Sequence, residues 1–423
     1  MSDTLKTLFS GSSRSGGSQD PPPDDSTANE VRPDVTPGAS IRVLGAGGGG
    51  SNAVKRMVDS KINGVDFMAV NTDIQALYHN PAATKITIGR GTTRGLGAGG
   101  NPDIGKKAAE ESTEELKAAL DGSDMVFLTA GLGGGTGGGS LGVIADLARS
   151  MGILTVAVVT KPFSFEGAKR RKQADEALEN LQDKVDTLVT IPNDKILSLI
   201  DKTTPLTEAF EVVDEVLQHA IEGISSLITV HGLVNVDFAD VKTIMQDAGT
   251  ALMGIGYGTG DSRAAEAARA AVDSPLLELS IDGAKGILFN VTGGTDLSMF
   301  EVDEAARIIT EAADTDANII FGAVIDENFT GEVKCTVIAT GFEAESLATT
   351  SSASMGQASA LKSALSSSIP SAKSDEFPQE KESEPRIVDP LEAKSTAVQL
   401  DEEELEVPAF MRKTVSGAKT SES

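Results

Sequence analysis

Short apolar runs alternate with stretches of helical character over most of the chain from Ile41 onward. The runs read IRVL at 41, DFMAV at 66, KITI at 85, DMVFLT at 124, ILTVAVVT at 153 and TLVTI at 187. Apolar runs of this length, separated by helical segments, are typical of buried strands in a parallel sheet with crossover helices. The pattern therefore predicts a first α/β domain over residues 40–203.

An amphipathic stretch follows Pro205, and its apolar positions are Phe210, Val213, Val216, Leu217, Ala220, Ile221, Ile224 and Leu227. Spacings of three and four residues place these side chains on one face of a helix, so we predict a central helix over 204–230. Beyond it, expected helices at 262–272 and 301–313 accompany apolar runs at 286, 318 and 333. This part predicts a smaller α+β domain over 231–343.

The two ends of the chain have a different composition. Residues 1–39 are rich in Ser, Gly, Pro and Asp, and residues 344–400 are polar and low in aromatics, so we expect a disordered N-terminal tail and a flexible linker. The apolar cluster VPAFMRK interrupts the polar tail within 401–414, and a last tail spans 415–423. This cluster is either a short segment that becomes ordered on a partner or a stray apolar patch.

Composition limits the partners of the 423-residue chain. A formal net charge of -27 would repel a phosphate backbone, so we do not expect a nucleic-acid partner. The single Cys335 excludes an internal disulfide, and histidines at 79, 219 and 231 give no zinc-ligand spacing, so no protein metal site is expected. Because the chain has neither a signal-peptide pattern nor an apolar run of about 18 residues, we expect a cytosolic or stromal protein without membrane insertion.

Two glycine-rich loops each follow a predicted strand and precede a predicted helix: GAGGGGSN at 45–52 and GLGGGTGGGS at 131–140. Glycines let the backbone approach a ligand closely, and the start of a helix favours an anion. Two such loops on one sheet predict a polyphosphate held from adjacent strand ends. Since the sequence lacks the lysine-bearing phosphate loop, backbone amides and a metal ion must meet the phosphate charge.

Other interpretations of the first loop remain open at this point. Gly45, Gly47 and Gly50 also fit G-x-G-x-x-G, which is typical of a dinucleotide-dependent oxidoreductase. The second loop argues against that class, as does Asn71, which stands where a ribose-binding acid is expected. Either loop alone is also compatible with a tight turn that binds nothing.

The second loop contains GGGTGGG, which resembles the signature of the tubulin and FtsZ family. Segments that resemble the FtsZ family follow one another in the family's order: GAGGGGSNAV, AVNTDIQAL, TRGLGAGGNP, KPFSFEG, IPNDKIL, GLVNVDFADV and NVTGGTDLSMFEV. The resemblance covers about residues 40–342 and implies a Rossmann-type GTPase domain joined by a long central helix to a smaller α+β domain. Gly138 departs from the signature, where Ser or Thr is usual, and leaves the hydrolysis rate open.

The resemblance also implies roles for individual residues. Gly48, Gly49, Gly50, Ser51 and Asn52 would surround the α- and β-phosphates, and Gly135, Thr136 and Gly137 the β- and γ-phosphates. Asn71, Asp73, Ala98 and Gly99 would lie beside the ribose and the γ-phosphate, and Glu166 and Arg170 at the ribose. Asn193, Phe210 and Asp214 would form the base site, where a carboxylate accepting from N1–H and the exocyclic amine selects guanine. Without the resemblance, Asp214, Arg170 and Asn193 are ordinary solvated or turn residues.

The resemblance further implies that Asn235, Asp237 and Asp240, in the loop after the central helix, complete the site of the next subunit. Asp237 and Asp240 project to one side of a helix start, where they can orient a water or hold a hydrated monovalent cation. They are equally suited to cap that helix. The implied protein is a GTPase that binds GTP or GDP with Mg²⁺ and polymerises head to tail.

By the same resemblance, the filament would form the division ring in the cytoplasm at mid-cell, or in the plastid stroma of a photosynthetic eukaryote. A membrane-anchoring adaptor or regulator would bind Val407 to Lys413. A GTP-binding scaffold that does not hydrolyse the nucleotide is the alternative within this family.

Overall fold

The computed structural model describes residues 38–342, apart from 199, 202, 231, 233, 235, 278–280, 327 and 328. The predicted linker, the 401–414 segment and the last tail lie outside the described residues, as does the predicted N-terminal tail except for its last two residues. Asn235, one of the three predicted catalytic residues, also lies outside them.

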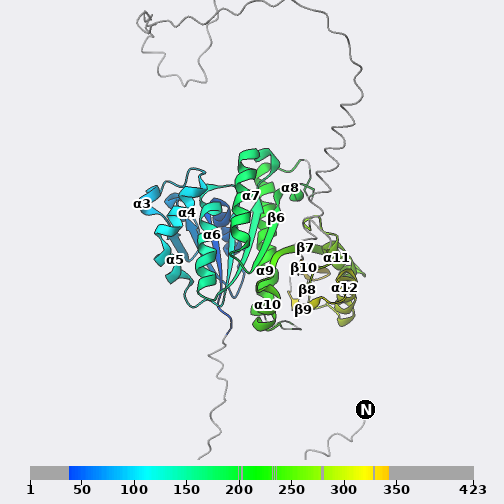
Figure 1. Ribbon diagram of the computed structural model, residues 1–423. Helices are drawn as coiled ribbons and strands as arrows, with labels where there is room; N and C mark the ends of the chain where they lie inside the picture. The colour runs from blue at the N-terminus through cyan, green and yellow to red at the C-terminus, as the bar shows by residue number, and fades with distance from the viewer. Residues whose placement is uncertain are drawn as a thin grey trace, which may run out of the picture. The chain divides into compact units, whose positions relative to one another are not determined.

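Ten strands in the described residues form one sheet in the order β3-β2-β1-β4-β5-β6-β7-β10-β8-β9 (Figure 1). Every pairing from β3 to β7 is parallel, β10 runs antiparallel to both β7 and β8, and β9 is parallel to β8. The strands are β1 (Ile41–Ala46), β2 (Asp66–Asn71), β3 (Thr84–Thr87), β4 (Met125–Gly131), β5 (Leu154–Lys161), β6 (Thr187–Pro192), β7 (Gly249–Thr259), β8 (Gly286–Gly293), β9 (Asn318–Ile325) and β10 (Glu332–Thr340).

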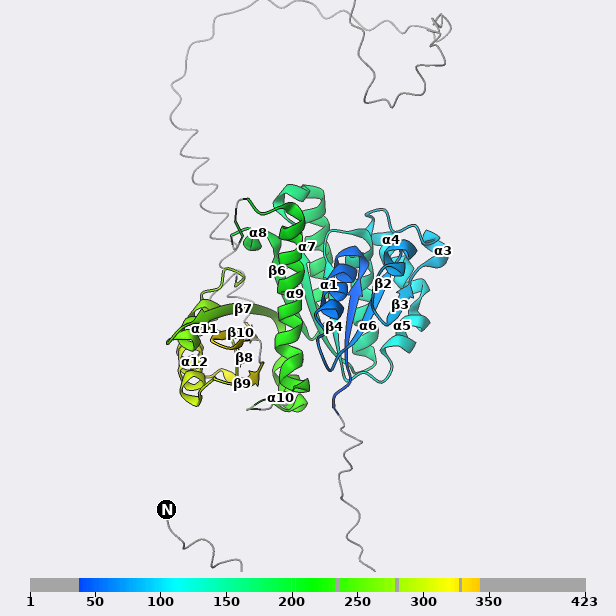
Figure 2. The ribbon, with the colours of Figure 1, turned by 180° about the vertical axis from the view of Figure 1, so that it is seen from behind.

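Helices connect these strands and cover both faces of the sheet (Figures 1 and 2). They are α1 (Gly47–Asp59), α2 (Ile74–Tyr78), α3 (Arg90–Thr93), α4 (Pro102–Glu111), α5 (Thr113–Leu120), α6 (Gly135–Ser150), η3 (Ser164–Glu166), α7 (Ala168–Gln182), α8 (Asn193–Ile196), α9 (Leu206–Thr229), α10 (Phe238–Met245), α11 (Arg263–Val272) and α12 (Met299–Ala312). Side chains of α1 and α9 pack on one face, and those of α4, α5, α6 and α7 pack on the other.

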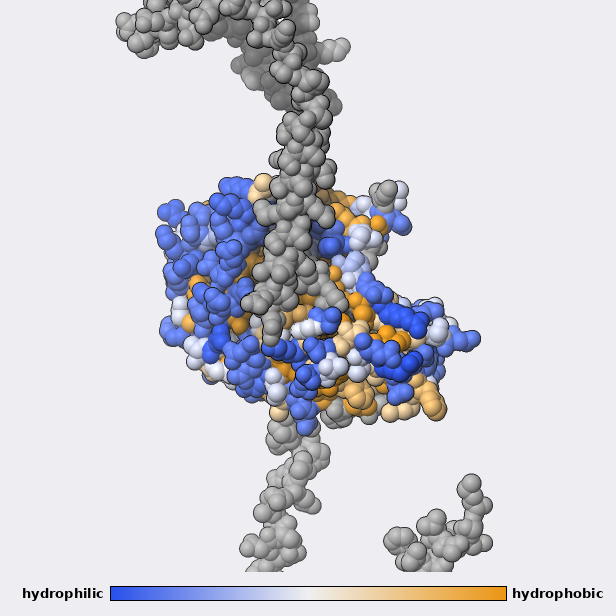
Figure 3. Space-filling view, turned by 45° about the vertical axis from the view of Figure 1, so that its right-hand side comes forward, coloured by the Kyte–Doolittle hydropathy of each residue, from blue (hydrophilic) through white to orange (hydrophobic). Residues whose placement is uncertain are grey.

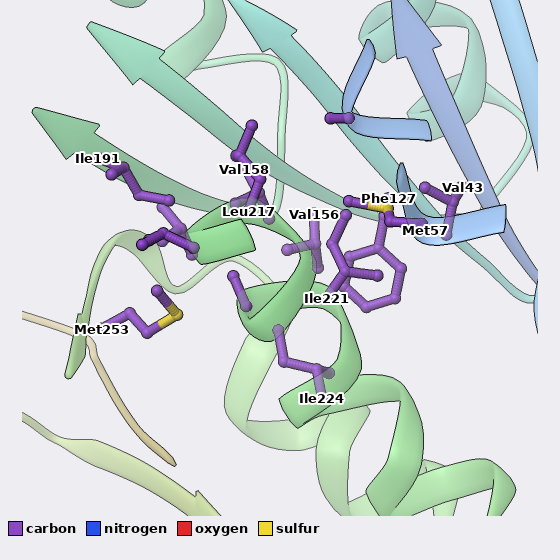
Figure 4. Packing of buried hydrophobic residues seen from close by; sticks show 14 of the residues in the cluster. Val43, Met57, Phe127, Val156, Val158, Ile191, Leu217, Ile221, Ile224 and Met253 are labelled. Carbon is purple, nitrogen blue, oxygen red and sulfur yellow. The ribbon is translucent and has the colours of Figure 1, made fainter. Parts of the chain in front are cut away.

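Helix α9 contributes the longest apolar surface to the first of these layers. Its buried Leu217, Ile221 and Ile224 belong to the cluster that also contains Phe127 of β4 and Val156 of β5 (Figure 4). Burying side chains of this size stabilises the fold by about 1.5–3 kcal/mol each. The helix is 24 residues long, which corresponds to about 36 Å, and it confirms the helix predicted from the apolar spacing.

Strand β7 was not predicted from the sequence, and it joins the two halves of the protein. It pairs with β6 on one side and with β10 on the other, so the strands of the two predicted domains form one continuous sheet. Its Gly254, Gly256 and Gly258 face α11, where a Cβ at each would lie 1.9 to 2.1 Å from a backbone oxygen of that helix. Only glycine permits this approach. The three glycines that the packing requires are therefore also the reason why the sequence pattern did not predict a strand here.

The architecture confirms the predicted fold class: a mostly parallel α/β half, a long helix, and a smaller half with an antiparallel strand. Hydrophilic residues predominate on the face shown in Figure 3, with apolar residues interspersed among them. None of the helices in the described ranges combines the length and the apolar character that a membrane crossing requires.

Candidate nucleotide-binding site

A cleft of about 390 Å³ opens where four adjacent parallel strands end. Gly48 follows β1, Gly131 ends β4, Pro162 follows β5 and Asn193 follows β6, and all four residues line it. The first half of α9 closes the cleft with Phe210, Val213, Asp214 and Leu217. The carboxyl end of parallel strands is the usual ligand position in open α/β sheets.

The cleft brings together most of the residues that were expected around a nucleotide. Its lining includes Gly48, Gly49, Asn52, Gly135, Thr136, Gly137, Glu166, Arg170, Asn193, Phe210 and Asp214. The expected residues that lie outside the lining are Gly50, Ser51, Asn71, Asp73, Ala98 and Gly99. The lining also contains residues that were not predicted as nucleotide contacts: Gly131, Leu132, Gly134, Thr160, Pro162, Val213 and Leu217. The second glycine loop and the helical spacing from Phe210 were signals for five of these seven.

Two helices begin at the cleft and direct their free N–H groups towards it. α1 starts at Gly47, directly after β1, and α6 starts at Gly135, soon after β4. The first N–H groups of a helix have no partner within that helix, and the helix dipole adds positive potential there. Neither first turn contains an acidic residue, so both helix starts favour a bound anion.

Within the first loop, the glycines have different roles. A Cβ at Gly45 would lie 2.2 Å from the Gly50 oxygen, and one at Gly50 would lie 2.3 Å from the Thr129 oxygen, so both are needed for close packing. Gly48 has no neighbour within 4 Å of a Cβ position and borders the cleft. Ser51 is buried beneath the loop rather than in the cleft lining.

Residues 71–73 shape one side of the site through contacts of their own. The buried Asn71 side chain accepts a hydrogen bond from the Thr72 N–H at 2.8 Å, and Asp73 caps α2 by accepting from Gln75 and Ala76. The Thr72 hydroxyl lies 2.7 Å from that of Thr136, so this segment is bonded to the second glycine loop. Thr72 is a contributor that the sequence analysis missed.

Residues 98–101 pack beside the second loop. A Cβ at Gly135 would lie 3.0 Å from the Ala98 Cβ and 2.7 Å from the Asn101 nitrogen. Gly99 has a φ of 59°, in the left-handed region that favours glycine. Ala98 and Asn101 therefore pack against the loop, and neither Ala98 nor Gly99 belongs to the cleft lining.

Asn193, Phe210 and Asp214 form a polar and aromatic corner of the cleft. Asn193 is 5% exposed, and its Oδ1 finds no hydrogen-bond partner among the described residues. Burial raises the pKa of Asp214 to about 6, although the Arg56 charge opposes the shift. Buried polar groups are normally satisfied, so an unpartnered amide beside a half-buried carboxylate indicates a polar ligand.

Glu166 and Arg170 also line the cleft and form an ion pair with each other. The Glu166 carboxylate also accepts a hydrogen bond from the Phe163 N–H at 3.0 Å, which fixes its position at the end of η3. Arg170 is more than half exposed, so its guanidinium remains accessible from the cleft.

Asp237 and Asp240 lie elsewhere. Both side chains are exposed at the start of α10, beyond the far end of α9 from the cleft (Figure 2). Asp237 occupies the N-cap position but its side chain makes no capping hydrogen bond to the described residues. Capping therefore does not account for this carboxylate.

Comparison with known proteins gives the class of this site. Residues 40–201 match the GTPase domain of the Tubulin/FtsZ family, and residues 249–343 match the C-terminal domain of the FtsZ family. The chain thus has the GTPase domain of the tubulin-like proteins, which implies binding of GTP and GDP.

Solved structures agree with this class. FtsZ of M. jannaschii, described as an empty dimer, is 50% identical over 72% of this chain and 88% of that chain, with a TM-score of 0.70. CetZ2 of Haloferax volcanii, described as a GTPγS-bound protofilament, is 22% identical over 76% and 99%, with a TM-score of 0.62, and shows the shared fold. The chain belongs to the FtsZ family.

The structure also locates the departure at Gly138. A Cβ there would lie 3.4 Å from the Ala177 Cβ, an ordinary contact, and Gly138 borders a separate hollow between α4, α6 and α7 instead of the nucleotide cleft. By contrast, a Cβ at Gly139 would lie 2.0 Å from the Pro102 oxygen.

These neighbours make a matched pair of variants. We expect Gly138→Ala to raise the free energy of unfolding by about 0.5–1 kcal/mol, because alanine is the better helix former and has room. Gly139→Ala should lower it by about 1–3 kcal/mol through overpacking. Urea titration measures both, and equal destabilisation by the two changes would contradict this placement of Gly138.

Proposed function

We propose that this protein is a GTP-hydrolysing filament subunit that assembles head to tail into a division ring and cleaves GTP at the subunit interface. The observation that carries the proposal is the separation of two parts of one active site along α9. Phe210 and Asp214 line the cleft near the start of α9, whereas Asp237 and Asp240 follow its end.

Within one molecule these two groups lie towards opposite ends of α9, because α10 follows its last turn (Figure 2). From Phe210 to Thr229 the helix rises about 28 Å, at about 1.5 Å per residue. The apolar face of α9 is packed against the sheet, so the helix cannot bend to bring Asp237 and Asp240 closer to the cleft. A second copy stacked end to end would bring its own Asp237 and Asp240 to the open cleft, and such a heterologous contact propagates as a filament.

This arrangement suits phosphoryl transfer, which depends mainly on positioning and charge stabilisation. In the proposal, the α1 and α6 helix starts hold the phosphates, and Asp237 and Asp240 of the next subunit orient the attacking water. Mg²⁺ would be bound with the nucleotide and would neutralise phosphate charge there, and the Asp237 and Asp240 carboxylates would suit a hydrated monovalent cation. The M. jannaschii relative, described as a dimer, supports self-association.

For the residues that line the cleft, we keep the roles that the family resemblance implies. Gly48, Gly49 and Asn52 would contact the α- and β-phosphates, Gly135, Thr136 and Gly137 the β- and γ-phosphates, Glu166 and Arg170 the ribose, and Asn193, Phe210 and Asp214 the base. Gly50, Ser51, Asn71, Asp73, Ala98 and Gly99 would act by shaping the loops that hold these groups.

The alternatives have less support. The family match and the second helix start at the cleft both argue against an oxidoreductase. A scaffold that does not hydrolyse GTP would have no use for two exposed carboxylates at the start of α10. We also propose that Val407 to Lys413 recruits a membrane-anchoring adaptor or regulator to the ring, which places the filament in the cytoplasm at the division site, or in the stroma of a plastid.

Base selection by Asp214 gives the first test. The ionised carboxylate accepts from guanine N1–H and the exocyclic amine, so GDP affinity should fall as pH drops through about 6, where Asp214 becomes protonated. Asp214→Asn should weaken GDP binding about 10- to 100-fold, remove this pH dependence and favour xanthosine diphosphate. Calorimetric titration across pH measures each effect, with exposed Glu208→Gln of the same helix as control. An unchanged GDP affinity in Asp214→Asn would rule out this role.

Complementation tests the shared site. Asp237→Ala and Asp240→Ala should each bind GTP normally but lose about a hundredfold in turnover, because the water is no longer oriented. Mixing Asp237→Ala, which has an intact cleft, with Asp214→Asn, which has an intact α10, should restore phosphate release above the sum of the two alone. Normal turnover in both alanine variants would defeat the proposal.

A further inference from the structure

The loop between β5 and α7 meets the nucleotide cleft through two of its residues, Glu166 and Phe163. Glu166 of this loop lines the cleft at the rim assigned to the ribose. Phe163 is 1% exposed, and its ring meets the edge of the Phe210 ring at 5.4 Å between centroids. Phe165 stacks on Phe163 at 5.0 Å. The position of this one loop therefore sets the Glu166 carboxylate and supports the Phe210 ring together.

A carboxylate from outside the cleft anchors this loop together with Arg171, which donates a hydrogen bond to the Ser164 hydroxyl oxygen at 2.5 Å. Asp194 Oδ1 accepts a hydrogen bond from the Ser164 N–H at 2.8 Å, and Oδ2 accepts from the Ser164 hydroxyl. Arg171 of α7 donates to the same Oδ2 at 2.9 Å. Asp194 itself is absent from the cleft lining and borders a separate hollow with Lys161 and Asp175.

Asp194 is also the neighbour of Asn193 in the first turn of α8. Successive helix residues point about 100° apart, so Asn193 faces the cleft while Asp194 faces the loop. The backbone position that directs the Asn193 amide to the proposed base site therefore also positions Asp194, which anchors the loop that carries Glu166. The two nucleotide contacts are joined through adjacent residues.

We infer that Asp194 is a positioning residue that couples the base end of the cleft to its ribose end by fixing the 162–167 loop. The inference rests on the proposed nucleotide site and adds a residue that touches no part of the ligand. Its effect should fall on recognition of the ribose by Glu166.

The chemistry of the contact supports this role. Burial alone would favour the neutral acid, but the hydrogen bonds from Ser164 and the charge of Arg171 outweigh it and lower the pKa of Asp194. The carboxylate therefore stays ionised at neutral pH. An exposed ion pair with Arg171 alone would contribute little, so the bonds to Ser164 carry the anchoring.

The test compares GDP with 2′-deoxy-GDP on nucleotide-free full-length protein, using calorimetry. The unaltered protein should bind the deoxy nucleotide about 5- to 10-fold more weakly, because a ribose hydrogen bond is lost. In Asp194→Ala, GDP affinity should fall about tenfold and the deoxy penalty should shrink to within about twofold. Asp194→Asn, which can still accept from the Ser164 N–H, should keep the penalty.

Asp175→Ala is the matched control, since Asp175 is an exposed, ion-paired carboxylate bordering the same hollow and pairs with Lys161. It should change neither value. Ser164→Ala, which removes one donor, should give an intermediate shift even if Asp194→Ala folds poorly. If folded Asp194→Ala still binds 2′-deoxy-GDP about 5- to 10-fold more weakly than GDP, the inference about Asp194 is wrong but the proposed function stands. If the unaltered protein binds neither nucleotide, the proposed function is wrong as well.

Discussion

The apolar face of α9 is buried against the sheet, and this packing fixes where the two parts of the proposed site lie. Leu217, Ile221 and Ile224 hold the helix on strands β4 and β5, with Phe127 and Val156 beneath them. A helix held along its length behaves as a rigid rod, so Asp214 and Asp237 keep a distance that no side-chain motion can close. The nucleotide cleft and the exposed carboxylates therefore serve different subunits in the proposed filament.

The glycine loops form the nucleotide-binding part of the proposed site. Close packing of the first loop on β4 brings the α1 helix start to the cleft, and Thr136 is bonded to Thr72 beside the α6 start. Both helix starts present N–H groups without any lysine of the usual phosphate loop. In the proposed filament, nucleotide binding is complete in one molecule, whereas the water that attacks the phosphate needs groups from a neighbour.

Local pattern was sufficient to predict much of this structure. Apolar runs predicted nine of the ten strands, and helical spacing predicted α9, because both signals depend on burial within a short segment. β7 escaped because Gly254, Gly256 and Gly258 replace the apolar side chains that mark a strand. Their role becomes visible only when α11 is seen lying against them.

The site residues that belong to a local sequence motif could be predicted. Those that depend on contacts between distant segments of the chain could not. Asp73 caps α2 and Gly50 packs on β4, details that a phosphate motif does not specify. The contact of Asp194 with Ser164 spans 30 residues of sequence and has no local signature. Gly138 departs from the family signature, yet it borders a different hollow, which only the fold could reveal.

The dependence of turnover on protein concentration tests the shared site most directly. Phosphate release from GTP, measured per subunit over a dilution series, should be near zero at low concentration and rise steeply once subunits associate. A rate per subunit that stays constant on dilution, into a range where light scattering detects no assembly, would contradict a catalytic site built from two molecules.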